Sequence, residues 1–169
     1  MCISFHSSFG RWQYTIDWYI CWLYSKKVSA SVQQIVHKKK IYAIIVRKSN
    51  QFKKKGVNFI TRGRELFQLG FIRHKKKHKI KSHYHIKQNR RINYFSEVLL
   101  IKKGVLKVKF YDANNNDIKK DKILRKDDII LLLKGGHGFE VLEDVGLIEI
   151  KQGPYHKYKD KILIWIKKK

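Results

Sequence analysis

Proline and cysteine are scarce in this 169-residue chain, with one proline and two cysteines. A single proline and ten glycines exclude a Pro- or Gly-rich linker between domains. Cys2 and Cys21 both lie near the start of the sequence, so the rest of the chain cannot hold a disulfide framework. This cysteine usage favours a reducing compartment, and we expect a cytoplasmic protein.

Long uncharged apolar runs are also absent. A membrane-spanning helix needs roughly 20 consecutive apolar residues. The most apolar segment lies between Arg11 and Lys26 and is interrupted by Asp17. Its charges do not follow the order of a secretory signal peptide, in which basic residues come first and small residues last. We therefore expect no transmembrane segment.

Acidic residues are few: 13 Asp and Glu stand against 39 Lys and Arg, giving a net charge of +26. Such a charge raises the question of nucleic-acid binding. Only eight of the basic residues are Arg, however, and Arg is the side chain whose planar fork matches phosphates and bases. The lysine excess favours a composition bias from an AT-rich coding sequence. Nucleic-acid binding stays open as an alternative, and a basic rim could equally attract a phosphorylated or acidic sugar.

The chain has the composition of a globular protein, 43% hydrophobic and 13% aromatic, and its length favours one domain. From residue 41 onward, short apolar or alternating runs are separated by turn signals every eight to twelve residues, which is typical of a β-sandwich or small barrel. No amphipathic run of twelve residues predicts a long helix. The sequence therefore predicts an all-β fold of about ten strands, at 42–47, 67–74, 80–86, 97–102, 105–111, 121–124, 129–133, 139–142, 147–151 and 161–166, with a further extended segment at 57–61.

Residues 1–40 differ from the rest. Between residues 12 and 24, aromatic and aliphatic side chains occupy every second position, which predicts a strand with one very apolar face. This segment could be an added edge strand, a membrane-surface contact or a homodimer contact, or it could be a translated extension outside the fold. Residues 29–40 read as a polar connector. We therefore divide the chain into an N-terminal extension, 1–40, and a β-domain, 41–169.

Three histidines and a carboxylate form a candidate metal site. His83 and His85 are separated by one residue, so on a strand their side chains share a face. Glu97 begins the next strand, and His137 follows the turn-forming pair Gly135-Gly136. Imidazole and carboxylate ligands suit a divalent first-row metal, and Zn, Fe, Mn, Ni or Co all fit this set.

The order of these motifs resembles the cupin superfamily: His-x-His, then Glu followed by six residues and Gly at 97–104, then a Gly-rich turn with His. Residues 42–161 resemble more closely a group of small bacterial cupins associated with surface-polysaccharide and sugar-nucleotide gene clusters. The resemblance implies a double-stranded β-helix, or jelly roll, and a sugar-type small-molecule ligand. The segment between His85 and Glu97 is longer than the cupin pattern has. The further residues that carry the resemblance are GVNFI at 56–60, GFIRHKK at 70–76, DIILL at 128–132, GGHGFE at 135–140 and EIKQGPY at 149–155.

Other residues are candidates for contacting a ligand. Glu97 and Tyr155 could move protons at a sugar carbon, as epimerases and ketoisomerases require. Arg90 and Arg91 could clamp a diphosphate bidentately. Lys151 and Gln152 close the last strand of the site with unusual polarity, and Gln152 or Tyr155 could orient an imidazole.

Each of these candidates also has a purely structural interpretation. Tyr155 could cap the core beside a strand-end turn, and Arg90 and Arg91 could be exposed loop charges. The sequence thus leaves three classes of function. The first is a metal-binding cupin that acts on or binds a sugar or sugar nucleotide, with sugar isomerase or epimerase chemistry if it is an enzyme. The others are a non-catalytic small-ligand binder and a basic nucleic-acid-binding protein.

Overall fold

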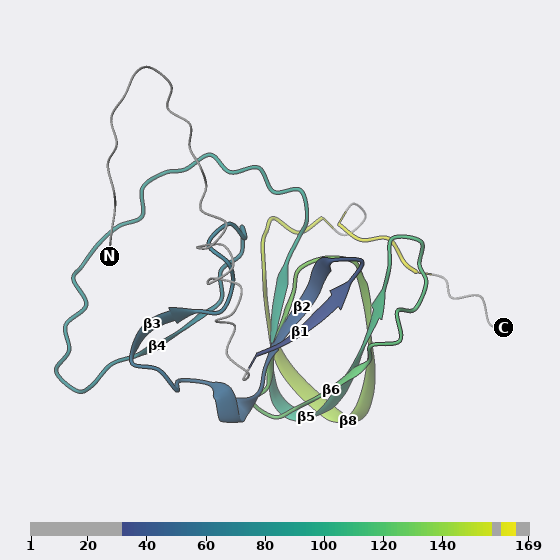
Figure 1. Cartoon of the computed structure of the whole chain (residues 1–169), viewed down its shortest axis with the longest axis horizontal. Helices are drawn as coiled ribbons and strands as arrows, with labels where there is room; N and C mark the ends of the chain where they lie inside the picture. Colours follow the sequence, from purple (N-terminus) through teal and green to yellow (C-terminus); the bar gives the residue numbers. More distant parts are fainter. Residues whose placement is uncertain (1–31, 157–159, 165–169) are drawn as a thin grey trace, which may run out of the picture.

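The computed structural model describes residues 32–156 and 160–164, and these residues form an antiparallel β-structure (Figure 1). No α-helix occurs in this part of the chain, which confirms the all-β prediction. The same residues contain no helix with the length and hydropathy needed to cross a membrane. The elements are β1 (Val32–His37), β2 (Lys40–Val46), the 3-10 helix η1 (Lys48–Asn50), β3 (Gly56–Phe59), β4 (Gly70–Arg73), β5 (Glu97–Tyr111), β6 (Lys122–Arg125), β7 (Ile129–Leu132) and β8 (Gly136–Lys151).

β5 is the central strand of the main sheet. One of its edges pairs first with β7 and then with β6, and the other edge pairs along its whole length with β8. β7 continues the sheet to β2 and then to β1, giving the order β1-β2-β7-β5-β6 with β8 against β5. All these pairings are antiparallel. β3 and β4 form a separate two-stranded sheet.

The β5–β8 ribbon curls until its two ends meet. Glu97 pairs with Lys151 at one end of the ladder, and Phe110 pairs with His137 near the other. Thirteen residues of straight strand would separate these ends by roughly 40 Å. Yet a carboxylate oxygen of Glu97 lies 3.3 Å from Nε2 of His137. Three register shifts between 101 and 106 increase the local bend, because bulges twist and kink a strand pair. Figure 1 shows the two strands curving together.

Apolar side chains fill both faces of the sheet. β2 and β7 are continuous apolar runs, as expected for strands covered on both sides. Ala43 and Ile45 belong to the larger cluster, whereas Ile44, between them, belongs to the smaller one. The larger cluster also contains Ile35, Tyr42, Leu99, Ile101, Leu106, Val108, Phe110, Leu124, Ile130 and Leu132.

The smaller cluster is covered by the connection between β3 and β4. Ile60, Phe67 and Leu69 pack there against Ile44 and Leu131. The two-stranded sheet is thereby tied to the main sheet through its connecting loop, although β3 and β4 hydrogen-bond only to each other among the described residues. The predicted strand at 67–74 is therefore shorter in the structure. Phe67 and Leu69 pack against the main sheet, and β4 begins only at Gly70.

A buried carboxylate ties β2 to the β6–β7 turn. Asp128 accepts a hydrogen bond of 2.6 Å from the Arg47 guanidinium and further bonds from the backbone N–H groups of Lys48 and Arg125. Arg47 also donates to the carbonyl of Ile123. Four hydrogen bonds therefore converge on this ion pair, and three of them satisfy the buried carboxylate of Asp128.

The first strand corrects the predicted domain boundary. The sequence predicts a polar connector at 29–40, within the N-terminal extension 1–40, but Val32–His37 forms β1 and pairs with β2 in the main sheet. Ile35 is only 3% exposed and sits in the larger cluster. The polar residues Gln33 and Gln34 come directly before this single buried position, so the sequence signal is weak. The aromatic alternation at 12–24 lies outside the described residues.

Several predicted strands differ from the structure. Residues 97–102 and 105–111 are one strand, β5, because Gly104 adopts a φ of +76° within the bend instead of ending the strand. Residues 139–142 and 147–151 are likewise one strand, β8. Residues 80–86 are not a strand, since no described strand hydrogen-bonds to them, and 161–164 are irregular. Residues 165–166 lie outside the described part of the chain.

Candidate functional site

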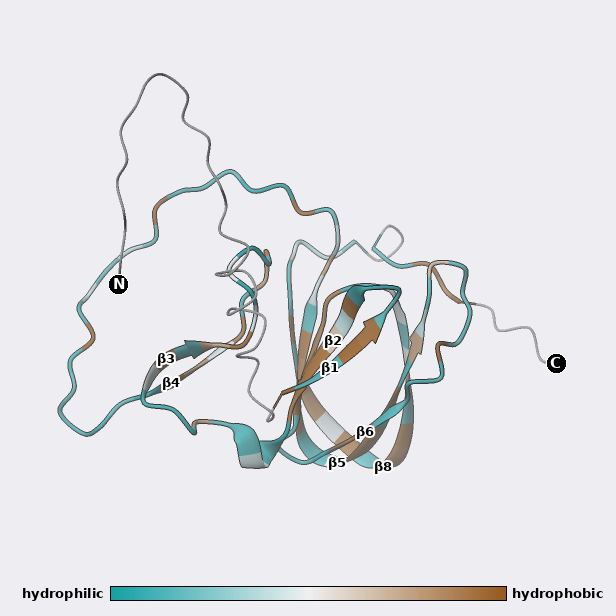
Figure 2. Ribbon diagram, in the orientation of Figure 1, coloured by the Kyte–Doolittle hydropathy of each residue, from teal (hydrophilic) through white to brown (hydrophobic). Residues whose placement is uncertain are grey.

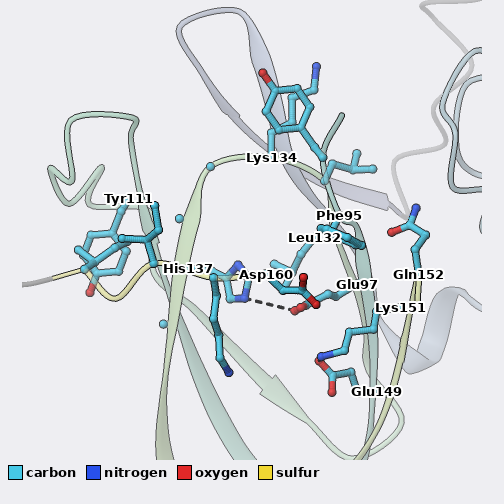
Figure 3. Close-up of a pocket in the computed structure, with 18 of the residues that line it drawn as sticks. Phe95, Glu97, Tyr111, Leu132, Lys134, His137, Glu149, Lys151, Gln152 and Asp160 are labelled. Carbon is cyan, nitrogen blue, oxygen red and sulfur yellow. Dashed lines mark hydrogen bonds and ion pairs between the residues drawn. The ribbon is translucent and has the colours of Figure 1, made fainter. Parts of the chain in front are cut away.

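A pocket of about 830 Å³ opens where the two ends of the curled ribbon meet (Figure 3). The start of β5, the end of β7, both ends of β8 and residues 160–164 line it. Its wall therefore comes from segments far apart in sequence, brought together by the curl. The polar lining residues are Asn93, Tyr94, Glu97, Tyr111, Lys134, His137, Glu149, Lys151, Gln152, Tyr155, Asp160 and Lys161.

Glu97 and His137 form a close polar pair in this pocket (Figure 3). The backbone of Glu97 pairs with both Leu132 and Lys151, so a three-stranded part of the sheet fixes its position. His137 comes from the start of β8, immediately after the Gly135-Gly136 turn. Their side chains are partly buried, 21% and 29% exposed, and their Oε2 and Nε2 atoms lie 3.3 Å apart. The site thus presents a carboxylate–imidazole pair to the pocket.

The pKa of Glu97 is lowered from its ordinary value. The hydrogen bond with His137 is the largest cause, and the positive charges of His137, Lys151 and Lys161 act in the same direction. Partial burial raises the pKa but does not outweigh these contributions. Glu97 is therefore a carboxylate at neutral pH, able to accept a hydrogen bond from a ligand or from His137.

Lys151 carries the positive charge nearest to this pair on β8. Its ammonium lies 3.3 Å from Oε1 of Glu149 and 4.9 Å from the centre of the Tyr155 ring. The hydrogen bond to Glu149 is the main cause that raises the pKa of Lys151, and the charges of Glu149 and Glu97 contribute. In such an arrangement the ammonium can bind an anionic group of a ligand, and the aromatic ring can pack against an apolar part of the same ligand.

Gln152 has a structural contact in addition to its place in the pocket. Its Oε1 accepts a 2.7 Å hydrogen bond from the backbone N–H of Ser96. This bond joins the end of β8 to the residue before β5 and so holds Glu97 at the pocket rim. The sequence offers Gln152 or Tyr155 as the residue that could orient an imidazole, but in the structure Glu97 is the polar group that His137 contacts.

Aromatic residues cover the rim of the pocket. Tyr94, Phe95 and Phe139 all line it with partly exposed rings. The Lys134 ammonium lies 5.8 Å from the centre of the Tyr94 ring. Together with Tyr155, these side chains provide flat apolar surfaces beside charged groups. Such a mixture is typical of sites that bind small polar molecules.

The predicted ligand set is only half assembled. Glu97 and His137 meet, but His83 and His85 lie in the long exposed segment between β4 and β5. Figure 1 shows this segment as a wide arc away from the main sheet. There Nδ1 of His83 lies 2.9 Å from the carbonyl oxygen of Lys81, and the His83 and His85 rings contact each other edge to face. Arg90 and Arg91 belong to the same exposed segment and do not line the pocket.

The arrangement does not by itself fit a bound metal ion. Glu97 and His137 supply two donors, whereas a catalytic zinc site uses three protein ligands. No group of three or more His, Cys, Asp or Glu side chains suited to a metal occurs among residues 32–156 and 160–164. A divalent metal therefore stays a prediction of the sequence.

Sequence reasoning missed part of the pocket. Tyr111, Phe139 and Asp160 line it, yet none was a candidate. Tyr111 ends β5 beside Gly136, so only the curl of the ribbon brings it near Glu97. Asp160 accepts a 2.6 Å hydrogen bond from the backbone N–H of His156, which shapes the last described turn. No local pattern marks any of these positions.

Comparison of the chain with protein-family models, with curated proteins and with solved structures finds no significant match.

Proposed function

We propose that this pocket binds a sugar-type small molecule, with Glu97 and His137 as the groups that hold or move a proton. The contact between these two side chains at the rim of the pocket is the observation that supports the proposal. A carboxylate and an imidazole 3.3 Å apart can act as a base and its partner once a ligand proton comes within hydrogen-bond reach. Sugar isomerisation and epimerisation next to a carbonyl need such a proton transfer.

The charges around the pair favour an acidic or phosphorylated ligand. Lys151 and Lys161 lower the pKa of Glu97 by their positive charge, so both lie close enough to act on an anion in the pocket. Lys134 adds a third cation at the rim. A nucleotide sugar combines a diphosphate for these lysines with flat rings for the neighbouring aromatic side chains. The resemblance to small cupins supports the same class of ligand and, with it, a jelly-roll fold.

Calorimetric titration of the full chain with a panel of nucleoside diphosphate sugars tests this proposal. We expect binding that His137→Ala and Lys151→Ala each weaken about tenfold or more. Arg90→Gln and Arg91→Gln serve as matched controls, because they remove positive charge outside the pocket. Equal losses in the pocket variants and in the controls would contradict binding in this pocket.

Catalysis is tested separately, by solvent deuterium exchange. A nucleoside diphosphate keto sugar bound beside Glu97 should take up deuterium at the carbon next to its carbonyl, and Glu97→Gln should abolish the uptake. Binding without uptake would favour the second candidate, a non-catalytic binder. The same assays, with and without a chelator and with the metal content of the purified chain, show whether the predicted divalent ion takes part.

A further inference from the structure

The outer edge of β8 has no partner strand among the described residues. β8 is 16 residues long and pairs only with β5 among the described strands, so the backbone N–H and C=O groups of its other edge have no strand partner there. Apolar side chains on β8 are exposed as well: Val141 is 58% exposed, and Ile148 and Ile150 about as much. Proteins normally cover or blunt a long edge of this kind, because it can pair with any other strand. This edge is therefore a surface for an added strand.

The same strand is the most acidic element of a basic chain. β8 carries Glu140, Glu143, Asp144 and Glu149, four of the 13 acidic residues. Glu140 pairs with lysines of β5 and Glu149 with Lys151. No such partner lies within ion-pair distance of Glu143 or Asp144 in the part of the chain that the structure describes. A basic strand would complement this edge, whereas a second copy of β8 would place like charges opposite each other.

One segment of the chain has the matching pattern. Residues 73–91 contain nine Lys and Arg and no Asp or Glu. Within them, Ile80, Tyr84 and Ile86 fall on one side of an alternating run and are strongly exposed, Tyr84 to 89%. Figure 2 shows this arc as mostly hydrophilic with separate hydrophobic positions. Alternation over seven residues is the pattern of a half-buried strand, and none of the described strands pairs with this run.

The end of the segment is already held beside β8. The backbone N–H of Ser96 donates to Gln152, just after β8, and the carboxylate of Glu97 touches His137 at its start. Ten residues, 87–96, can span up to roughly 33 Å, so residue 86 can reach the first residues of β8. Because residue 86 is nearer to this anchor than residue 80, the run would lie antiparallel to β8.

We propose that residues 80–86 add to the free edge of β8 in the same chain, as an antiparallel strand along residues 136–143. Lys81 then lies near the acidic middle of β8. The tether favours the chain's own segment over that of a second copy, because a short flexible linker holds it at an effective concentration of about millimolar. His83 and His85 lie on the same face of the added strand. If that face is turned toward the pocket, both histidines lie on the same side as His137, and if it is turned away, neither does. The proposal does not depend on the proposed function.

Hydrogen–deuterium exchange of the full chain tests this pairing. We expect the amides of residues 80–86 to exchange at least about tenfold more slowly than in an unstructured peptide. Tyr84→Pro removes a ladder donor and should restore fast exchange in 80–86 and in the outward-facing amides of 136–143. Gln88→Pro, in the tether, is the matched control and should leave the protection intact. Tyr84 is outside both apolar clusters, so its replacement should leave the main sheet folded.

A charge exchange provides a second measurement. Lys81→Glu should speed exchange in residues 80–86, and adding Glu143→Lys should slow it again. Unprotected amides at 80–86 in the unaltered chain would overturn the proposal. If residues 80–86 are protected only at protein concentrations at which light scattering detects dimers, the added strand comes from a second copy. That result would also overturn the proposal.

Discussion

Glu97 is at once a sheet residue and a pocket residue. Its backbone lies between β7 and β8, while its carboxylate faces His137 across the pocket. The sheet fixes the backbone, so little freedom remains for the side chain to leave the imidazole. Partial burial alone would raise the pKa of this carboxyl, and the net lowering shows that the hydrogen bond and the nearby cations have the larger effect.

Replacing His137 by Ala should therefore raise the pKa of Glu97. The substitution removes the largest cause of the lowering and leaves burial in place. Carboxyl carbon shifts in an NMR pH titration measure the pKa directly. His85→Ala is the control, because His85 lies outside the pocket and should not change the titration. An unchanged Glu97 pKa in the His137 variant would contradict the observed contact.

The same pKa shift links Glu97 to stability. A folded-state pKa below the unfolded-state pKa adds stability above the unfolded value, and that contribution is lost as pH falls through the folded value. The difference in unfolding free energy between the unaltered chain and the His137→Ala variant should therefore narrow as the pH is lowered through the acid range in which Glu97 titrates. Urea unfolding over that range measures this difference.

At the scale of elements, the bend of β5 decides where the pocket forms. Gly104 has a φ of +76°, which residues with a side chain rarely adopt, and a Cβ there would collide with the carbonyl oxygen of Asp144 on β8. The bend thus brings the two backbones too close for any residue but glycine. A straighter ribbon would separate Glu97 from His137 and open the pocket.

Gly104→Ala should lower the free energy of unfolding by about 2 kcal/mol or more, from backbone strain and from the contact with β8. Gly63→Ala is the matched control, because an added Cβ there meets nothing within 4 Å and the φ is not positive. Its expected effect is within about 0.5 kcal/mol. Equal effects of the two substitutions in urea unfolding would show that the bend does not require glycine.

β1 is the second element whose role the structure changes. Ile35→Ala should cost about 2–4 kcal/mol, because it empties a fully packed position in the larger cluster. Val36→Ala, at the exposed neighbour, should cost much less. Thermal unfolding of both variants measures the loss of stability that each substitution causes. A neutral Ile35→Ala would support the original division, in which residues 1–40 are dispensable for the β-domain.

At the scale of the whole molecule, the net charge of +26 acts on any polyanion. Counterion release makes such binding weaken steeply with salt. We expect affinity for a random DNA duplex to fall at least about a hundredfold between about 50 and 200 mM salt, and Glu97→Gln to leave it unchanged. A nucleotide sugar in the pocket should lose much less over the same range. Tight duplex binding that persists at high salt would instead favour the nucleic-acid alternative.

The amino-acid sequence alone determined the all-β class and the approximate places of most strands, and it singled out Glu97 and His137, which the structure brings into contact. Continuous apolar runs such as those of β2 and β7 are buried wherever they lie, so local patterns predict them. Strand pairing is not local. At Gly104 the sequence predicts a turn, whereas the structure has a bend within β5. Glycine suits either, because it readily adopts the positive φ found there.

Only the tertiary structure decided that β5 and β8 are single curled strands and that Tyr111 and Asp160 share a pocket with Glu97. It also separated His83 and His85 from His137, although all three had been assigned to one site. A period of two fixes which side chains share a face, but it does not fix which strand lies alongside. Partners and register depend on contacts between residues far apart in the chain, and here those contacts bring the ends of the β5–β8 ribbon together.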